Sequence, residues 1–377
     1  MRNTGIRRFL KNIEIWGRLR ILDVLRLLFA SRIKYDRIEK SELKGRILFI
    51  RPDRLGDVII STPVFRILKE KEPKVEITVL ASNRNKNIVK KLPYVDRIVL
   101  YHKNPLLFFL SLFRVLLTGY DFAVDLMDIP SVTSSVYLIF SRARYRLGFS
   151  QKPGGYNVNF IYNVRVPLMI KEKTHIIERT AQVLKPFGID FSLQDLRPDF
   201  PLTDEDLKFG ERFISMIGWE GKIVGINISA GKSTRWWGEE NYIELAKGIT
   251  RRGYRVLLLT HLDDIERANT IIGGVGNMIR LGPVTGDFSK FASVLRWLYI
   301  LVTPDTSVVH IASAFNIPVV GLYPADYQNL VSWRPYLVPN RVVQSPVKDE
   351  LHHIKVEWVL DAFDSLVDEL QSKGQNL

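Results

Sequence analysis

The sequence of 377 residues contains no cysteine, which excludes disulfide bonds, thiolate metal ligands and a cysteine nucleophile. Histidine is also scarce. The six histidines form no H-E-x-x-H or similar ligand pattern, so we predict no metal site. The adjacent His352 and His353 have no partner that the sequence reveals. Uncharged apolar runs of about 18 residues are missing as well, which argues against a membrane-spanning helix.

Acidic residues are outnumbered by basic ones, and the excess is unevenly distributed. Lysine and arginine total 54 against 40 aspartates and glutamates, which gives a formal net charge of +14. Residues 1–40 alone hold eleven basic and four acidic side chains, a balance of +7. A surface of this sign attracts phosphate in nucleic acid, in anionic lipid or in a nucleotide.

The N-terminal stretch FLKNIEIWGRLRILDVLRLLFASRI predicts an amphipathic helix. Its charged residues interrupt the apolar segment that a signal peptide requires. Large apolar residues recur every three or four positions, with arginines mostly between them, at Phe9, Ile13, Trp16, Leu19, Leu22, Leu25 and Phe29. Such a helix either lies in a membrane interface or packs on the body of the protein, and both alternatives stay open here.

From Arg46 onward, short apolar runs alternate with helical patterns, which is typical of a parallel sheet covered on both faces. Residues 141–167 resemble irregular loops, and 191–205 a proline-containing linker. The strands predicted before the linker are Ile47–Ile50, Glu76–Leu80, Arg97–Leu100 and Phe122–Asp125. Those predicted after it are Lys222–Ile228, Tyr254–Leu259, Met278–Leu281, Ile300–Thr303 and Pro318–Leu322.

The predicted fold class is therefore α/β, with two doubly wound parallel-sheet domains and a ligand cleft between them. We predict a basic N-terminal extension, a first domain, a linker, a second domain and a C-terminal helix, at residues 1–45, 46–190, 191–205, 206–350 and 351–377. The apolar segment Asn104–Gly119 is interpreted as a core helix, and a helix bordering lipid is the alternative.

In the stretch RILFIRPDRLGDVIISTPVFRIL, a buried strand gives way to a helix at Leu-Gly-Asp. The carboxyl end of such a strand faces the ligand crevice of a parallel sheet. Gly56 permits a tight turn there, and Asp57 falls in the first turn of the helix. An acid at this position either stabilises the helix end, by about 0.3–1 kcal/mol, or serves as general base for a hydroxyl group.

Two later loops have the composition of a phosphate-binding site. In NISAGKSTRWWGEENYIEL a strand leads into a loop that offers hydroxyl groups, backbone N–H groups and positive charge, from Ser229, Gly231, Lys232, Ser233, Thr234 and Arg235. In LVTPDTSVVHIASAFNIPVVGLYP a strand leads into a helix start with Asp305, Thr306, Ser307 and His310. Capping by Asp305 and a core position for His310 are the alternatives. The first loop is no P-loop, because Ile226 stands where that motif needs its first glycine.

At these three stretches the chain resembles the ADP-heptose–lipopolysaccharide heptosyltransferases, glycosyltransferase family nine. IRPDRLGDVIISTPVFRILKEKEPKVEITVLAS is similar to the opening strand, LGD turn and helix of that family. The loop from Asn227 to Leu245 is similar to its donor-diphosphate segment, and PDTSVVHIASAFNIPVVGLYP to its DT(G/S)xxH segment. Residues 1–45 and the pairs Trp236-Trp237 and Tyr323-Pro324 depart from the family pattern.

The resemblance implies a GT-B fold and an inverting, metal-independent transfer of heptose or a related sugar from a nucleotide donor, ADP-heptose, to a lipid-linked acceptor. It implies no cofactor and makes Asp57 the base and Arg235 the diphosphate contact. An acid holding the ribose is Asp264 or Glu266. Acceptor contacts are expected from Arg51, Arg54 and Gly56, with Arg142, Arg144 and Arg146 as further candidates, and a solvated basic face is the alternative for the arginines. The expected location is the inner face of the cytoplasmic membrane, on its anionic surface.

Two rival functions follow from other features of the sequence. A nucleotide-sugar 2-epimerase shares the two-domain architecture, and a nucleic-acid-binding protein accounts for the charge of +14. The second rival lacks a recognised binding motif and gives Asp57 no role, so we predict no nucleic-acid partner.

Overall fold

The computed structural model describes residues 2–31, 33–39, 43–129, 131–150, 157–166, 169–230 and 235–374, with side chains from Trp16 onward. The chain divides into two compact units. The first comprises Met1–Met169 and Ile177–Leu196, and the second Ile170–Ile176 and Arg197–Leu377. The chain therefore passes from the first unit to the second, back again, and finally to the second.

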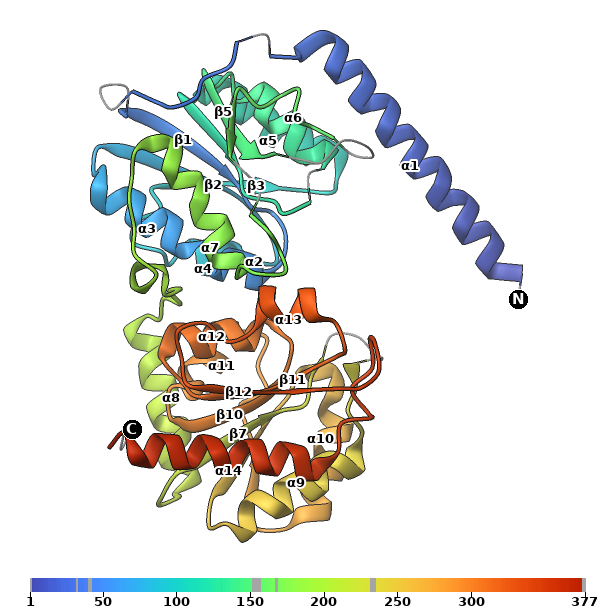
Figure 1. The fold of residues 1–377 in the computed structure, drawn as a ribbon, viewed down its shortest axis with the longest axis vertical. Helices are drawn as coiled ribbons and strands as arrows, with labels where there is room; N and C mark the ends of the chain where they lie inside the picture. Colours follow the sequence, from blue (N-terminus) through green and yellow to red (C-terminus); the bar gives the residue numbers. More distant parts are fainter. Residues whose placement is uncertain are drawn as a thin grey trace. The chain divides into compact units, whose positions relative to one another are not determined.

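The first unit is built around a six-stranded, wholly parallel sheet in the order β3-β2-β1-β4-β5-β6 (Figure 1). Its strands are β1 Gly45–Ile50, β2 Val75–Ser82, β3 Arg97–Tyr101, β4 Phe122–Asp125, β5 Tyr145–Phe149 and β6 Val164–Val166. Its α-helices are α1 Arg2–Phe29, α2 Leu55–Ile59, α3 Thr62–Lys71, α4 Lys86–Val89, α5 Pro105–Thr118, α6 Val132–Phe140 and α7 Ile176–Ala181. Buried apolar residues alternate between the two faces of these strands, so both faces are covered.

One face of this sheet carries α5, α6 and the end of α1. Leu48, Ile50 and Ala123 pack there in one cluster with Leu22 of α1 and Leu112 of α5. The opposite face carries α3, where the Phe49 and Phe65 rings lie 4.9 Å apart. The sheet is thus enclosed as a parallel sheet requires.

The second unit holds another six-stranded parallel sheet, in the order β12-β11-β10-β7-β8-β9. Its strands are β7 Ile223–Asn227, β8 Arg255–Leu259, β9 Ile279–Leu281, β10 Leu298–Pro304, β11 Val319–Tyr323 and β12 Asn340–Gln344. Its α-helices are α8 Asp204–Ile217, α9 Glu239–Arg251, α10 Ile265–Val275, α11 Phe288–Leu295, α12 Ser307–Phe315, α13 Tyr327–Trp333 and α14 Val356–Ser372. A large core cluster joins β7, β8 and β10 to α9, α10 and α14.

The two sheets have the same connectivity. Each starts with its central strand, builds outward to one side, and then returns to build the other side. This order places a topological switch point between β1 and β4 in the first sheet and between β7 and β10 in the second. Ligands of open α/β sheets bind at the carboxyl ends of the strands beside such a point. The predicted α/β fold class with two doubly wound sheets is confirmed.

The structure differs from the sequence prediction in several elements. Residues 141–167 are not only irregular loop, because β5 and β6 lie there, and β12 also adds a strand that was not predicted. The single helix expected after β1 is two, and it breaks at Ile60 and Ser61. Gly56 is the second residue of α2 rather than a turn residue, and its carbonyl accepts from the Ile60 N–H at 3.0 Å.

Helix α5 is not the core helix that we predicted. Only one of its faces is buried, and the other carries exposed leucine and phenylalanine side chains. Helix α1 likewise buries Leu22 while Trp16 on its other side is exposed. Among the described residues, no helix is long and apolar enough to cross a membrane.

Candidate active site

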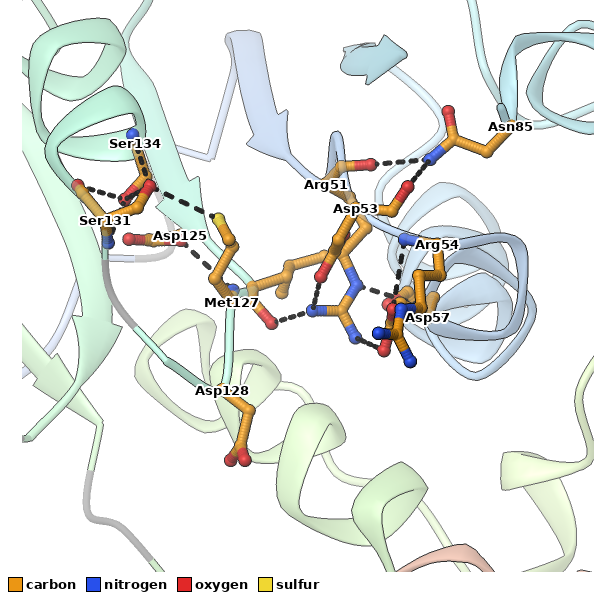
Figure 2. A network of polar contacts seen from close by, with 12 residues as sticks. Arg51, Asp53, Arg54, Asp57, Asn85, Asp125, Met127, Asp128, Ser131 and Ser134 are labelled. Carbon is orange, nitrogen blue, oxygen red and sulfur yellow. Dashed lines mark hydrogen bonds and ion pairs between the residues drawn. The ribbon is translucent and has the colours of Figure 1, made fainter. Parts of the chain in front are cut away.

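A group of charged side chains lies at the switch point of the first sheet (Figure 2). Strand β1 ends at Ile50, Arg51 follows it directly, and α2 begins four residues later at Leu55. Because β1 and β4 are neighbours, the loop after β1 meets the loop after β4 at this edge. Figure 2 shows Arg51 pointing from the first loop toward the start of α2 on one side and Met127 on the other.

Asp57 has a structural role at the start of α2. One carboxylate oxygen accepts a hydrogen bond from the backbone N–H of Arg54 at 3.1 Å, which caps the helix. The other oxygen, Oδ1, lies 3.8 Å from a terminal nitrogen of Arg51, and the side chain remains partly accessible. Capping therefore uses only one of the two oxygens and fixes the direction in which the other points.

Arg51 is an internal residue and not the acceptor contact that we predicted. It is 1% exposed. Its Nε donates to the backbone carbonyl of Asp57 at 2.9 Å, and one terminal nitrogen donates to the carbonyl of Leu126. That same nitrogen lies 3.3 Å from Asp53 Oδ2. Arg51 thus ties the loop after β1 to α2 and to the loop after β4, whereas the Arg54 side chain is exposed and available to a ligand.

Asp53 belongs to the same network, in surroundings that disfavour its ionised form. Asn85, from the segment after β2, donates to the backbone carbonyls of Arg51 and Asp53 at 3.0 and 3.4 Å. Burial raises the pKa of Asp53 to about 6, with the Asp57 carboxylate adding to the rise and the Arg51 guanidinium opposing it. Two carboxylates therefore share one buried guanidinium, and the pKa of Asp53 is raised above its ordinary value.

A second buried acid, Asp125, closes the end of β4. Its oxygens accept from the Met127 N–H at 3.1 Å and from the Tyr162 hydroxyl at 2.9 Å. Burial raises the pKa of Asp125 above its ordinary value. Nearby, Asp128 points away from Arg51 in Figure 2 and lies 3.7 Å from Arg179. Sequence reasoning missed these acids, although Asp125 ends a predicted strand at the ligand edge.

The second sheet repeats this arrangement with different residues. At the end of β7, Asn227 donates to the Thr303 hydroxyl of β10 at 2.9 Å. A terminal nitrogen of Arg235 contacts Asp305 Oδ2 at 3.0 Å and donates to the Asp305 carbonyl at 3.0 Å. Asn329 of α13 donates to the same carboxylate at 2.9 Å. The structure therefore brings Arg235 and Asp305, predicted from separate loops, into direct contact.

Of the two acids considered for the ribose, the structure brings only Asp264 to the loop after β7. The Ser229 hydroxyl donates to Asp264 Oδ2 at 2.8 Å and accepts from the His261 N–H at 2.8 Å. Arg267 pairs with Asp264 at 3.1 Å and stacks over Trp236 at 4.5 Å. Glu266 is exposed, away from this group of contacts.

The remaining predicted donor residues have different outcomes. Thr306 is the N-cap of α12, with Ser307 as its first helical residue, so the helix start lies at the switch edge as predicted. His310 is 3% exposed with its ring 5.8 Å from that of Trp333, which fits the core alternative rather than the phosphate contact. Gly231, Lys232, Ser233 and Thr234 lie outside the described residues.

Two interpretations of minor motifs can also be compared with the structure. Trp237, part of the pair that departs from the family pattern, is a packing residue: it is buried, and its indole N–H donates to the Ile354 carbonyl at 2.8 Å. The two adjacent histidines do have a partner, because Glu350 Oε2 lies 3.6 Å from His352 Nε2 and 3.2 Å from His353 Nε2. This exposed group is the one cluster of three ligand-type side chains found in the described part of the chain.

Comparison with known proteins decides between the alternatives. The model of the family described as glycosyltransferase family 9 (heptosyltransferase) matches residues 109–361. The chain belongs to glycosyltransferase family 9. The matched range includes Arg235, Asp264 and Asp305 of this glycosyltransferase, whereas Asp57 lies before it. The nucleotide-sugar 2-epimerase alternative is not favoured.

Relatives and solved structures agree with this assignment. Lipopolysaccharide heptosyltransferase 3 of Escherichia coli strain K12 is 24% identical over 296 residues, covering 74% of this chain and 82% of that protein. The family 9 glycosyltransferase of Veillonella parvula has the same fold at a TM-score of 0.74, with 19% identity, 90% of this chain and 99% of that chain covered. ADP-heptose lps heptosyltransferase II of E. coli has it at 0.68, with 21% identity and coverage of 86% and 99%. The glycosyltransferase therefore has the GT-B fold.

Proposed function

We propose that this glycosyltransferase moves a heptose or a related sugar from a nucleoside diphosphate donor, ADP-heptose, to a lipid-linked acceptor of the lipopolysaccharide core. The names of the relatives support the sugar and the acceptor class, since the matched proteins of E. coli are heptosyltransferases of lipopolysaccharide. The observation that carries the chemistry is the position of Asp57. It is a carboxylate fixed at a switch point by one oxygen, while the other oxygen lies 3.8 Å from the Arg51 guanidinium and is partly accessible.

On this proposal the transfer inverts the anomeric configuration in one displacement. The acceptor hydroxyl oxygen forms a bond to the anomeric carbon, and its proton passes to Asp57 as general base. The bond between that carbon and the diphosphate oxygen breaks, and ADP leaves with the electron pair. Because Asp57 is held in place by the Arg54 N–H, it needs little reorganisation before it accepts the proton.

The second unit supplies the groups for the donor. Arg235 is fixed beside the start of α12 by its bonds to Asp305, so positive charge and the N–H groups of a helix start lie at one sheet edge. Such groups stabilise the charge that develops on a leaving diphosphate. We propose that they replace a metal ion in this role and that Asp264 holds the ribose hydroxyls.

The test compares the wild type with Asp57→Asn on ADP-heptose and a Kdo–lipid A acceptor in EDTA, reading ADP release and the mass of the acceptor. Asparagine keeps an oxygen that can accept from the Arg54 N–H, so the cap survives while the base is lost. We expect the wild type to add one heptose and the variant to be slower by about 10²–10⁴-fold, with unchanged ADP binding. Full activity of the variant would show that Asp57 is only a helix-capping acid.

A further inference from the structure

Helix α5 exposes a continuous apolar stripe. Leu106, Phe109, Leu110, Phe113 and Leu117 are 56% to 70% exposed. Their spacing of three or four residues places all five on one side of the helix. Single exposed apolar residues are common on soluble proteins, but five large ones on one face of a helix indicate an interaction surface.

The stripe is not the side of α5 that packs on the sheet, because the opposite side of the helix already contacts the core. Leu112 and Val115 are buried in the cluster that covers the sheet. The Phe108 ring meets Tyr137 of α6 edge to face at 5.6 Å. The helix is therefore apolar on both sides, and its outer side has no partner within the described part of the first unit.

Helix α1 repeats this pattern beside the same core. Leu22 is buried in the cluster that also contains α5 and α6 residues. On the other side of α1, Trp16, Val24, Leu27 and Leu28 are 55% to 85% exposed. Figure 1 shows α1 on the side of the first unit that carries α5 and α6. The first unit thus carries two helices with outward apolar faces.

The chain around α5 lacks negative charge, whereas α1 contains Glu14 and Asp23. No aspartate or glutamate occurs between Arg97 and Tyr120 or between Ile129 and Lys171. The three acids between these segments are engaged, since Asp121 accepts from the Arg46 N–H at 2.8 Å, Asp125 is buried, and Asp128 faces Arg179. Exposed cations in or near these elements include Lys103, Arg114 and Arg142, and Arg26 of α1. Arg20 of α1 is also exposed but pairs with Asp23 at 3.5 Å.

We propose that the outward faces of α1 and α5, the docking faces, bind the surface of an anionic lipid bilayer. Apolar side chains enter the region between headgroups and acyl chains, while the surrounding arginines and lysines meet lipid phosphates. A second copy of the chain is a poor occupant, because a symmetric contact would oppose the same cations to each other. The inference rests on the proposed function in one respect: a lipid-linked acceptor is presented at such a surface.

The experiment measures flotation of the full-length protein with vesicles of phosphatidylethanolamine and phosphatidylglycerol, and with phosphatidylcholine vesicles alone. Phe109→Ser/Phe113→Ser/Leu117→Ser removes part of the stripe, and Lys103→Glu/Arg114→Glu reverses charge beside it. Met216→Ser/Trp297→Ser, at exposed apolar positions of the second unit, is the matched control. Thermal unfolding of each variant checks that the fold is retained.

We expect the wild type and the control to float with the anionic vesicles. The stripe variant should lose about tenfold or more in partition coefficient, because three large apolar side chains no longer enter the lipid. The charge-reversal variant should lose binding to anionic vesicles only. Equal flotation of wild type and stripe variant would overturn the proposal. So would a dimer that dissociates in the stripe variant without any vesicle binding by the wild type.

Transfer to a water-soluble, delipidated acceptor separates this inference from the proposed function. If both are correct, the stripe variant keeps that activity and loses transfer to acceptor embedded in vesicles. A wild type that floats but transfers no heptose to either acceptor would contradict the proposed function but not the proposal that the docking faces bind lipid. A stripe variant with full transfer to the embedded acceptor would contradict only the proposal about the docking faces.

Discussion

The Arg51 guanidinium is bonded to Asp57 through the backbone and not primarily through charge. Its Nε donates to the Asp57 carbonyl at 2.9 Å, whereas its terminal nitrogen stays 3.8 Å from Asp57 Oδ1. This geometry holds the start of α2 in position without neutralising the carboxylate at close range. A tight ion pair would favour the ionised acid and weaken it as a base.

Arg51→Lys should destabilise the protein and slow the reaction. A lysine cannot satisfy the Asp57 and Leu126 carbonyls and Asp53 together, so buried acceptors lose their donor. We expect a loss of about 3–5 kcal/mol in the free energy of unfolding. Urea denaturation measures it, and the exposed Arg54→Lys, expected to change stability by under about 0.5 kcal/mol, is the control.

Asp53→Asn should alter how stability depends on pH. The pKa of Asp53 is raised to about 6 in the folded protein from its ordinary 3.8, so the folded state binds a proton that the unfolded state has released. The stabilising contribution of protonated Asp53 is complete below about pH 4 and is lost as the pH rises through about 6.

The difference in stability between Asp53→Asn and wild type should therefore shift in favour of the variant by about 2–3 kcal/mol between pH 4 and pH 6.5. Urea titrations of both proteins at each pH measure the shift. A difference that stays constant over this range would mean that Asp53 is ionised throughout and that its burial has been compensated.

Arg235→Ala should weaken donor binding through the diphosphate alone. We expect ADP affinity to fall by about 10- to 100-fold, since a charge-assisted contact is lost, while adenosine affinity stays the same. Calorimetric titration with both ligands measures this. Arg341→Ala, which breaks an ion pair with Glu369 elsewhere in the second unit, is the matched control. An equal loss for adenosine would indicate a general collapse of the loop.

Asp264→Asn and Glu266→Gln discriminate between the two acids considered for the ribose. Asp264 is joined to the loop after β7 through Ser229, whereas Glu266 is exposed. We expect only Asp264→Asn to weaken adenosine binding, by about tenfold. The reverse result would assign the ribose to Glu266.

Metal removal should leave the transfer rate unchanged. Arg235 and the start of α12 are proposed to meet the charge of the leaving group, so no Lewis acid is needed. Rates after dialysis against EDTA and after readdition of Mg²⁺ or Zn²⁺ measure this. His352→Ala/His353→Ala should also be fully active. A rate restored only by metal, and lost in the histidine variant, would give the Glu350 cluster a catalytic role that we do not assign.

The central strands were predictable from sequence because they are buried on both faces and read as apolar runs. Three strands were not predicted. Strand β5, between β4 and β6, contains Arg146 and Gly148. The other two are edge strands: β6 has three residues, and in β12 only Val343 is buried. Strands that are short, partly solvated or interrupted by such residues carry little apolar signal, so a sequence pattern cannot separate them from loops.

The candidate site was predictable as a set of loops but not as a network. Asp57, Arg235 and Asp305 follow predicted strands, so the doubly wound topology alone places them at ligand edges. The burial of Arg51 was not predictable, because its partner Leu126 is 75 residues away and becomes a neighbour only through the pairing of β1 and β4. The exposure of one side of α5 was hidden for a similar reason, since an apolar helix gives no sign of which face is covered.

The path of the chain between the two units affects how the protein is made. Residues 170–176 belong to the second unit but precede the last part of the first. His175 bonds to the Arg334 carbonyl, 159 residues later. At a synthesis rate of about 5–20 residues per second, this segment waits roughly 8 to 30 seconds on the ribosome for its partner. All residues of the first unit, up to Leu196, are synthesised well before then. During synthesis the first unit can therefore fold while residues 170–176 still lack their partners in the second unit.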